Sequence, residues 1–299
     1  MKSILVAESL REFAASVSGD VVLQFFSSEV PAGDYTILVP TVTNRIGRAE
    51  LDALPQLQLI ANYGVGYDNI DIAGARERGI AVTNTPGVLT GATAELTWAL
   101  ILAVTRRIGE GERLVRTGKW TGWAPTQLRG MSLEGKTLGI VGAGRIGREV
   151  GRRAAAFGMA VLYWGRTRHG GLEFVELDEL LRKSDVVSIH LSRSRETEEL
   201  IDARKLALLK DGAVLINTAR GSIVDEDALV KELLAGRISA GLDVYTHEPR
   251  IPAELLELEN VVVLPHLGSA TREARQGMWD VVWRNVTAKL QGGPLVTPV

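Results

Sequence analysis

The sequence of 299 residues contains no cysteine and only four histidines. Without cysteine the chain cannot form a disulfide, a thiolate metal site or a cysteine nucleophile. The histidines do not show a metal-binding spacing such as HExxH, so we expect no metal. The absence of cysteine also fits a reducing compartment, and we expect a cytoplasmic protein.

The sequence also lacks an excess of either charge and has no long apolar run. The net charge is −2, which leaves no broad basic surface for nucleic acid or an acidic membrane. The most apolar stretch, "LTWALILAV" (96–104), is too short to cross a bilayer and is typical of a buried helix. The N-terminal "MKSILVAESL" has no apolar region as long as that of a signal peptide. We therefore expect neither a nucleic-acid partner nor a membrane partner.

Short β-branched runs alternate with helical patterns, which predicts α/β architecture with parallel sheets. One long helix is expected from about residue 92 to about residue 117, followed by an extended loop over 117–136 that is rich in Gly, Thr and Trp. The strands expected before this helix are residues 3–7, 21–25, 36–39, 57–61 and 80–83.

A second series of strands starts at residue 137 and predicts a Rossmann-type, doubly wound parallel sheet. Its six expected strands are residues 137–141, 160–164, 185–189, 213–217, 239–244 and 260–264. The last helix, roughly 270–291, follows after this sheet is complete, so we expect it to return to the first domain. The expected domains are 94–269 for a dinucleotide and a discontinuous 1–93 with 270–299 for the substrate.

The segment "TLGIVGAGRIGREV" (137–150) contains GxGxxG as Gly142, Gly144 and Gly147. Here the motif follows an apolar strand and opens a helix, which is the context that dinucleotide binding requires. The first Gly allows a tight turn, the second lets the backbone approach a pyrophosphate, and the third lets helix and strand pack closely. A glycine turn without a ligand is the alternative.

The next strand lacks the acidic residue that would bind the ribose hydroxyls of NAD. The segment "VLYWGRTR" (161–168) holds Arg166 and Arg168 instead. A guanidinium can bind a 2′-phosphate through parallel hydrogen bonds, whereas a carboxylate would repel it. We therefore predict NADP as the cofactor, with NAD as the alternative. If the two arginines bind no ligand, they are solvated charges of a surface loop.

Three polar residues follow the carboxyl ends of other strands, where ligands bind in open α/β sheets. Arg220 suits a substrate carboxylate, His266 suits proton exchange near neutral pH, and Glu248 beside it would favour the charged imidazole. His190 also ends a strand and is a rival to His266. Each residue alone is more often a capping or packing residue, and only the set indicates a catalytic site.

The segment "ANYGVGYDNID" (61–71) follows an expected strand in the first domain. Gly64 and Gly66 flank Val65 there, and such a turn can aim backbone N–H groups at an anion. An ordinary strand-to-helix connection is the alternative.

Several segments together resemble the D-isomer-specific 2-hydroxyacid dehydrogenases, in the order found in that family. "NTPGVLT" and the "GKWTGWAP" loop resemble the glyoxylate/hydroxypyruvate reductase branch in particular. The segments that carry the family resemblance are "NYGVGYDNID", "VTNTPGVLT", "GKTLGIVGAGRIG", "INTARGSIVDEDAL", "GLDVYTHEP" and "PHLGSAT".

The resemblance implies a role for each matching residue. Arg220 would bind the substrate carboxylate and carbonyl oxygen, His266 would donate the proton, Glu248 would pair with His266, and the backbone of Val65 and Gly66 would also hold the carboxylate. Asp243 would meet the nicotinamide carboxamide or, alternatively, cap its strand. The cofactor contacts implied by the resemblance or by the glycine motif are Gly142, Gly144, Arg145, Ile146, Gly147, Gly165, Arg166, Thr167, Thr218, Asp243 and Gly268.

The family resemblance implies two α/β lobes, a flavodoxin-like substrate domain beside the Rossmann-type domain, and a homodimer. The segment "HLSRSRET" (190–197) departs from the family, which commonly has a Pro here, and it adds a possible phosphate contact. We predict a reductase of small 2-oxo acids that uses NADPH or NADH. The alternatives are a dehydrogenase of a larger D-2-hydroxy acid and a cofactor-sensing interaction protein on the same fold.

Overall fold

The computed structural model describes residues 2–15, 17, 21–168 and 170–299. These residues form two compact units, each of which is described separately. The small unit comprises Met1–Leu89 and Ala270–Val299, and the large unit comprises Thr90–Ser269. Each unit holds one parallel sheet with helices, which confirms the predicted α/β fold class.

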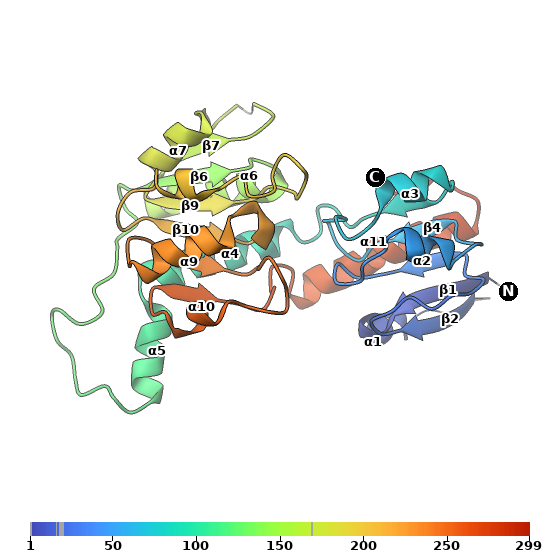
Figure 1. Cartoon of the computed structure of the whole chain (residues 1–299), viewed down its shortest axis with the longest axis horizontal. Coiled ribbons are helices and arrows are strands. Elements are labelled where there is room, and N and C mark those ends of the chain that lie inside the picture. The colour runs from blue at the N-terminus through green and yellow to red at the C-terminus, as the bar shows by residue number, and fades with distance from the viewer. Residues whose placement is uncertain (1, 16, 18–20, 169) are drawn as a thin grey trace. The chain divides into compact units, whose positions relative to one another are not determined.

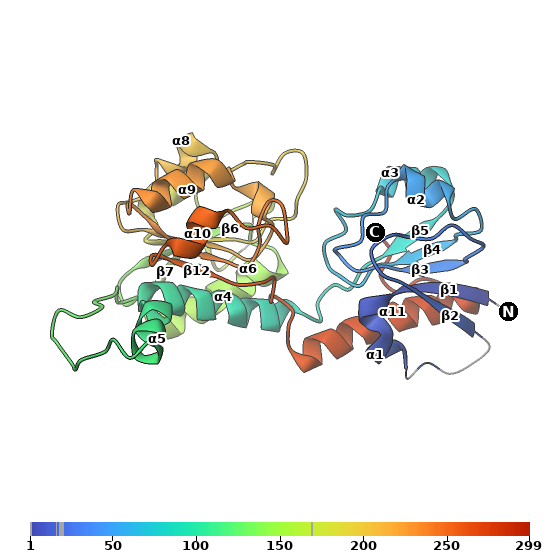
Figure 2. The ribbon, with the colours of Figure 1, turned by 60° about the horizontal axis from the view of Figure 1, so that its bottom comes forward.

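The sheet of the small unit has five parallel strands in the order β2-β1-β3-β4-β5, the strand order of flavodoxin. Helix α11 covers one face, and helices α2 and α3 lie on the other face (Figures 1 and 2). The strands are β1 (Lys2–Ala7), β2 (Val21–Phe26), β3 (Ile37–Val39), β4 (Leu59–Ala61) and β5 (Ala81–Thr83). The helices are α1 (Arg11–Ala14) after a 3-10 turn (Glu8–Leu10), α2 (Arg48–Asp52), α3 (Ile72–Glu77) and α11 (Arg272–Leu290).

The sheet of the large unit has seven strands in the order β12-β11-β10-β9-β6-β7-β8, and every adjacent pair is parallel. This is the doubly wound order with one added strand. The strands are β6 (Thr137–Val141), β7 (Ala160–Trp164), β8 (Glu173–Phe174), β9 (Val186–Ile189), β10 (Val214–Asn217), β11 (Ser239–Leu242) and β12 (Val261–Val263). The six longer strands were predicted; the two-residue β8 was not.

Helices cover both faces of this sheet, so the large unit has two hydrophobic cores. Helices α4 and α6 cover one face, and α8 and α9 cover the other (Figure 2). Helix α7 packs in the same core as α8 and α9. Because both faces are covered, the strands are nearly continuous apolar runs, which is typical of parallel sheets. The helices are α4 (Thr90–Thr105), α5 (Ile108–Arg116), α6 (Arg145–Ala154), α7 (Leu177–Lys183), α8 (Ala203–Leu206), α9 (Glu226–Leu234) and α10 (Ala253–Glu257), with 3-10 turns at Ala155–Phe157 and Gly221–Ile223.

The single helix expected over about 92–117 is wrong, because two helices occupy this range. Arg107 has a φ of 53° in the left-handed region, which ends α4 and turns the chain into α5. No Pro lies at the break, and the nearest Gly, Gly109, falls inside α5, so no local pattern predicts the break. Residues 117–136 form no helix or strand, as expected, and within the described ranges no helix is both long and apolar enough to cross a membrane.

Candidate functional site

The β6 turn, residues 142–144, leads from β6 into α6. Gly142 has a φ of 101°, and a Cβ there would lie 2.9 Å from the backbone of His190. A Cβ on Gly147 would lie 2.2 Å from the carbonyl oxygen of Gly142. A Cβ on Gly144, the N-cap of α6, would meet no atom within 4 Å. Two glycines are thus required by packing, whereas Gly144 leaves open space before a helix N-terminus, where an anionic group is favoured.

Basic residues follow β7 beside the β6 turn. The N–H of Gly142 donates to the carbonyl of Trp164 at 2.8 Å, so Gly165 and Arg166 start next to the turn. Arg166 and Thr167 are exposed. The guanidinium of Arg168 instead lies over the ring of Phe174, 4.0 Å from its centroid. Arg166 is therefore better placed than Arg168 to meet an anion at this edge.

Asp243, directly after β11, organises the segment that carries His266. Its carbonyl accepts from the N–H of His266 at 3.0 Å, and its carboxylate accepts from the N–H groups of Leu267 at 2.6 Å and Gly268 at 2.8 Å. The side chain is fully buried, and this burial raises the pKa of Asp243 although both N–H groups act against it. Of the two roles predicted for Asp243, these bonds support the cap.

Helix α4 ties two of the predicted cofactor residues to one place. The hydroxyl of Thr93 donates to the carbonyl of Gly268 at 2.9 Å. One turn later, the hydroxyls of Thr97 and Thr218 lie 3.0 Å apart. All of these side chains are buried. Thr218 after β10 and Gly268 after β12 are therefore both anchored to the N-terminal half of α4.

Glu248 and His266 form a hydrogen-bonded pair. The Nδ1 atom of His266 lies 2.8 Å from Oε2 of Glu248, and Oε1 accepts from the N–H of Tyr245 at 3.0 Å. Burial alone would raise the pKa of Glu248, but the hydrogen bond and charge of His266, the Tyr245 N–H and the charge of Arg220 hold that pKa below its ordinary value. The pair is partly exposed, at 35% for His266 and 31% for Glu248, so a substrate can reach the imidazole.

The backbone of His266 is held in an unusual conformation. Its φ is 54°, in the left-handed region that a residue other than Gly seldom adopts. The hydrogen bonds to Asp243 on both sides of this peptide fix the conformation. Such local strain is found where a side chain must be aimed in one direction.

The rival His190 lies in a different environment. Its Nε2 lies 2.8 Å from the hydroxyl of Ser188, and burial lowers the pKa of His190 to about 3. An imidazole with this pKa is neutral at physiological pH. Its backbone closes the space beside Gly142, which gives His190 a packing role and favours His266 as the proton donor.

The β4 turn, residues 64–66, lies in the small unit. A Cβ on Gly64 would lie 2.3 Å from Cγ1 of Val42, so only Gly fits there. The amide of Asn62 donates to the carbonyl of Gly66 at 2.8 Å, and the amide of Asn84 donates to the carbonyl of Val65 at 2.8 Å. Within the described ranges, the N–H groups of Val65 and Gly66 have no hydrogen-bond partner. The turn can therefore present them to an anion.

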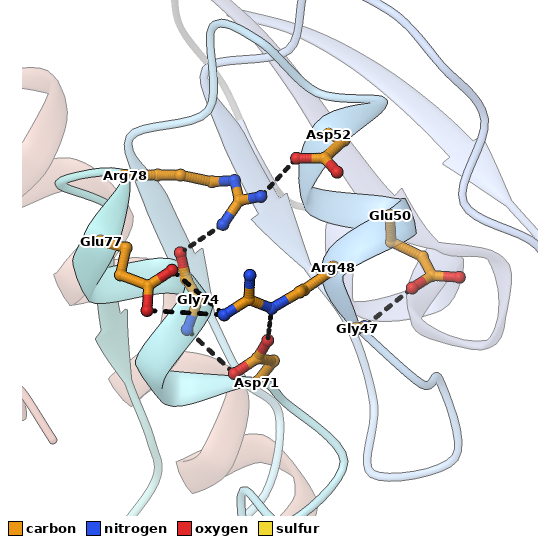
Figure 3. Close-up of polar contacts among 8 residues, drawn as sticks. All are labelled: Gly47, Arg48, Glu50, Asp52, Asp71, Gly74, Glu77 and Arg78. Atoms are coloured by element: carbon orange, nitrogen blue, oxygen red, sulfur yellow. Dashed lines mark hydrogen bonds and ion pairs between the residues drawn. The ribbon is translucent and has the colours of Figure 1, made fainter.

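The end of this connection is fixed by a cap and an ion-pair network (Figure 3). Asp71, the N-cap of α3, accepts from the N–H of Gly74 at 2.9 Å. The guanidinium of Arg48 lies 3.7 Å from the carboxylate of Asp71 and 3.2 Å from that of Glu77. The bond from the N–H of Asp71 to the carbonyl of Ile46, at 2.8 Å, joins the same point to the chain before α2.

Sequence patterns identified the residues at strand ends but missed those that hold them. Thr93 and Thr97 lie in an apolar helix, where a threonine can serve only for packing, so the hydrogen bonds of their hydroxyls were not predicted. Asn62 and Asn84 lie within two of the segments that carry the family resemblance, but their amides bond to a turn whose structure depends on tertiary contacts. For Thr93 and Thr97 the available signal was a polar residue in an otherwise apolar run, and for Asn62 and Asn84 it was their place in segments that carry the family resemblance.

Comparison with known proteins gives concordant similarities. Residues 98–268 match the D-isomer specific 2-hydroxyacid dehydrogenase, NAD binding domain. The chain is 50% identical over 266 residues to a glyoxylate reductase of Thermococcus litoralis, covering 85% of this chain and 80% of that protein.

Two solved structures share the whole fold. One is an NADPH-dependent glyoxylate/hydroxypyruvate reductase of Sinorhizobium meliloti in complex with NADP and malonate, with 35% identity, a TM-score of 0.91 and coverage of 100% of this chain and 96% of that chain. The other is a D-lactate dehydrogenase of Aquifex aeolicus complexed with NAD and lactic acid, with 28% identity, a TM-score of 0.87 and coverage of 97% and 96%.

The matched domain supplies a nicotinamide cofactor site, and the similarity to glyoxylate reductases confirms the branch predicted from the sequence. The substrate class that follows is a small 2-oxo or 2-hydroxy acid. This chain belongs to the D-isomer specific 2-hydroxyacid dehydrogenase family and is a nicotinamide-dependent enzyme.

Proposed function

We propose that this protein reduces glyoxylate and hydroxypyruvate to the corresponding 2-hydroxy acids with NADPH. The observation that carries the proposal is the hydrogen bond of 2.8 Å between His266 and Glu248, beside the charge of Arg220. The identity to a glyoxylate reductase supports the choice of substrate.

Each of the three residues has a distinct role in reduction. Arg220 binds the carboxylate of the 2-oxo acid and polarises its carbonyl oxygen. Protonated His266 donates a proton to that oxygen as negative charge develops on it. Glu248 orients the imidazole through Nδ1, which leaves Nε2 as the donor.

The β6 turn and α6 suit the phosphates of the cofactor. Gly144 leaves the space for close approach, and the first N–H groups of α6, at Arg145 and Ile146, are in position to bind an anion. Thr218, Asp243 and Gly268 line the neighbouring strand ends on the proposed nicotinamide side. When bound, NADPH supplies the hydride, while these residues hold and orient it.

NADPH is proposed over NADH because Arg166 and Thr167 follow β7 where an acid would bind the ribose of NAD. The relative solved with NADP supports this choice. The charge of Arg166 also acts on Glu196, although the hydrogen bond from Ser194 is the main cause that lowers the pKa of Glu196. We expect Arg166→Asp to lower the ratio of kcat/KM for NADPH over NADH by about tenfold or more. A wild-type preference for NADH would contradict the proposal.

We further propose that the small unit is the substrate domain and the large unit the cofactor domain. The N–H groups of Val65 and Gly66 offer a backbone site for the substrate carboxylate. The extent of the small unit, 1–89 with 270–299, is close to the substrate domain predicted from sequence.

A homodimer is proposed from the exposed apolar residues of α5 and the loop after it. Trp123 is 82% exposed, Trp120 is 53% exposed, and Ile108 and Val115 on α5 are more than half exposed. Apolar surface of this kind usually marks an interface. Light scattering at micromolar concentration should give twice the chain mass of 32.3 kDa, and Trp123→Glu should give a monomer.

A panel of 2-oxo acids assayed with NADPH and NADH tests the function. We expect glyoxylate and hydroxypyruvate to have the highest kcat/KM, and His266→Ala to lose most turnover while still binding NADPH. Faster turnover of phenylpyruvate than of both would assign the protein to larger acids. Absence of turnover with every acid would favour a cofactor-sensing protein.

A further inference from the structure

Residues 296–299 extend the sheet of the small unit. The N–H of Val299 donates to the carbonyl of Val82 at 3.0 Å, and Pro298 bridges Thr83 in antiparallel fashion. The N–H of Asn84 in turn donates to the carbonyl of Thr297. This segment therefore pairs with β5 and with the residue directly after it.

A buried side chain on α11 fixes the same segment. Asn285 is fully buried, and its Oδ1 accepts from the N–H groups of Val296 at 2.9 Å and Thr297 at 3.2 Å. Its Nδ2 donates to the hydroxyl oxygen of Thr297 at 2.9 Å. An amide that satisfies both its donor and acceptor in the core gives a segment one defined position.

From Thr297 the bonds continue to the β4 turn. The hydroxyl of Thr297 donates to the carbonyl of Asn84 at 2.6 Å, and Nδ2 of Asn84 donates to the carbonyl of Val65 at 2.8 Å. The carbonyls on either side are held as well, since Thr85 N–H donates to Gly64 at 3.0 Å and Asn62 Nδ2 donates to Gly66.

The geometry of the peptide bond means that contacts to the carbonyl groups of the β4 turn also determine where its N–H groups point. In a trans peptide the C=O of one residue and the N–H of the next point to opposite sides. Holding the carbonyls of Gly64, Val65 and Gly66 therefore directs the N–H groups of Val65, Gly66 and Tyr67 away from the supporting side chains. Three successive N–H groups aimed outward form an anion site that depends on its support.

We propose that Asn84 and Thr297 are positioning residues for the carboxylate of the substrate, so that residues 296–299 help set the affinity for the 2-oxo acid. This rests on the proposed function. Neither side chain touches the substrate; both act through the carbonyl of Val65. The expected signature is a rise in KM for the acid, with kcat and cofactor binding largely retained.

The kinetic test uses Thr297→Val, which keeps the shape but removes the hydroxyl. We expect KM for glyoxylate to rise about fivefold because the hydrogen bond from Thr297 to the carbonyl of Asn84 is lost, with kcat within about twofold and NADPH affinity unchanged. Thr297→Ser should restore KM. Thr36→Val is the matched control, because its hydroxyl bonds to Ser3 between strands away from the turn. Equal KM values for Thr297→Val and Thr36→Val would overturn the proposal.

Asn84→Ala removes the donor to Val65 itself and should raise KM for glyoxylate more than Thr297→Val does. If Asn84→Ala does not fold, the Thr297 variants still decide the question. An unchanged KM in folded Asn84→Ala would overturn the proposal, because the carbonyl of Val65 would then need no support.

Amide hydrogen exchange separates this proposal from the proposed function. In Thr297→Val the amides of Asn84 and Thr85 should exchange faster, while the amide of Ile46, which bonds to Asn69 on the other side of the connection, should not. If the wild type reduced no 2-oxo acid, the function would fail, yet the exchange would still report on the support of the turn. Unchanged exchange at Asn84 and Thr85 would contradict the claim that Thr297 supports the β4 turn.

Discussion

The β6 turn and the β4 turn both place glycines within three residues of the end of a parallel strand, but they are built differently. The β6 turn runs straight into α6, so the helix itself supplies aligned N–H groups. The β4 turn is followed by a loop, and α3 begins only at Ile72. Its N–H groups are aimed by side chains that lie far away in the sequence, including Asn84 and Thr297. The two proposed anion sites, one built locally and one built by tertiary contacts, thus share the same glycine spacing.

The two turns also differ in what a side chain would strike. A Cβ on Gly147 would meet the carbonyl of Gly142, which is backbone and cannot be shortened by mutation. A Cβ on Gly64 would meet the side chain of Val42, which a mutation can shorten. No second substitution should therefore relieve the clash when Gly147 is replaced. When Gly64 is replaced, a smaller residue at position 42 should relieve the clash.

The largest effect is expected from Gly147→Ala. Forcing apart α6 and the β6 turn should lower the free energy of unfolding by about 1–3 kcal/mol and greatly weaken NADPH binding. Thermal unfolding and fluorescence titration with NADPH measure both. Gly151→Ala is the control on the same helix, since its Cβ would lie 3.5 Å from Val161, an ordinary contact. Wild-type NADPH affinity in Gly147→Ala would remove the difference between the turns.

A smaller and more selective effect is expected from Gly64→Ala. The displaced turn should raise KM for glyoxylate by about tenfold, while NADPH affinity stays at the wild-type value. The double variant Gly64→Ala with Val42→Ala removes the clash and should recover part of the loss. Steady-state kinetics with glyoxylate decides; a double variant as impaired as the single one would mean that the clash is not the cause.

This difference explains how much the sequence could predict. Apart from the two-residue β8, the strands of both sheets follow from local patterns of apolar and β-branched residues, and the β6 turn follows from glycines at fixed spacing. Arg220, Glu248 and His266 were found because strand ends of a parallel sheet meet at one edge. A capping role was predicted for Asp243, but its partners Leu267 and Gly268 were not, and neither were the Asn84 support and the break at Arg107. The partners of Asp243 and Asn84 lie in distant segments of the chain, which local patterns do not show.

The two turns and the proton donor should respond differently to pH, which NADPH affinity and kcat/KM for reduction can measure separately. Neither turn contains a titrating side chain, so NADPH affinity should vary little above neutral pH, where the 2′-phosphate is ionised. The hydrogen bond and charge of His266 hold the pKa of Glu248 below its ordinary value, although burial alone would raise it. Glu248 is therefore ionised at neutral pH, and kcat/KM for reduction should stay high there and fall on the alkaline side.

Replacing Glu248 with Gln keeps the shape and removes the charge. The alkaline limb of kcat/KM should then move to lower pH by up to about one unit, with less loss at acid pH. The lowered pKa of Glu248 also affects folding stability. It contributes stability that is present above the unfolded pKa and is lost as the pH falls through the folded pKa. A pH profile of Glu248→Gln that coincides with that of the wild type would mean that the pair is not coupled.

The smallest effect is expected at the far end of the β4 turn, where Arg48 faces Asp71 and Glu77 (Figure 3). The side chain of Arg48 is 65% exposed, and exposed ion pairs contribute little because solvent screens them. Arg48→Gln should change the free energy of unfolding by less than about 0.5 kcal/mol and leave KM for glyoxylate unchanged.

Asp71 itself should matter more than its ion pair, because its carboxylate caps α3 through the N–H of Gly74. Asp71→Ala should cost about 1 kcal/mol, whereas Asp71→Asn keeps an acceptor and should resemble Arg48→Gln. Chemical denaturation of the three variants gives the comparison. If Arg48→Gln were as destabilising as Asp71→Ala, charge rather than capping would fix the end of the β4 turn, and this turn would depend on salt. The β6 turn, which packs glycine against backbone, would then be the only one of the two insensitive to ionic strength.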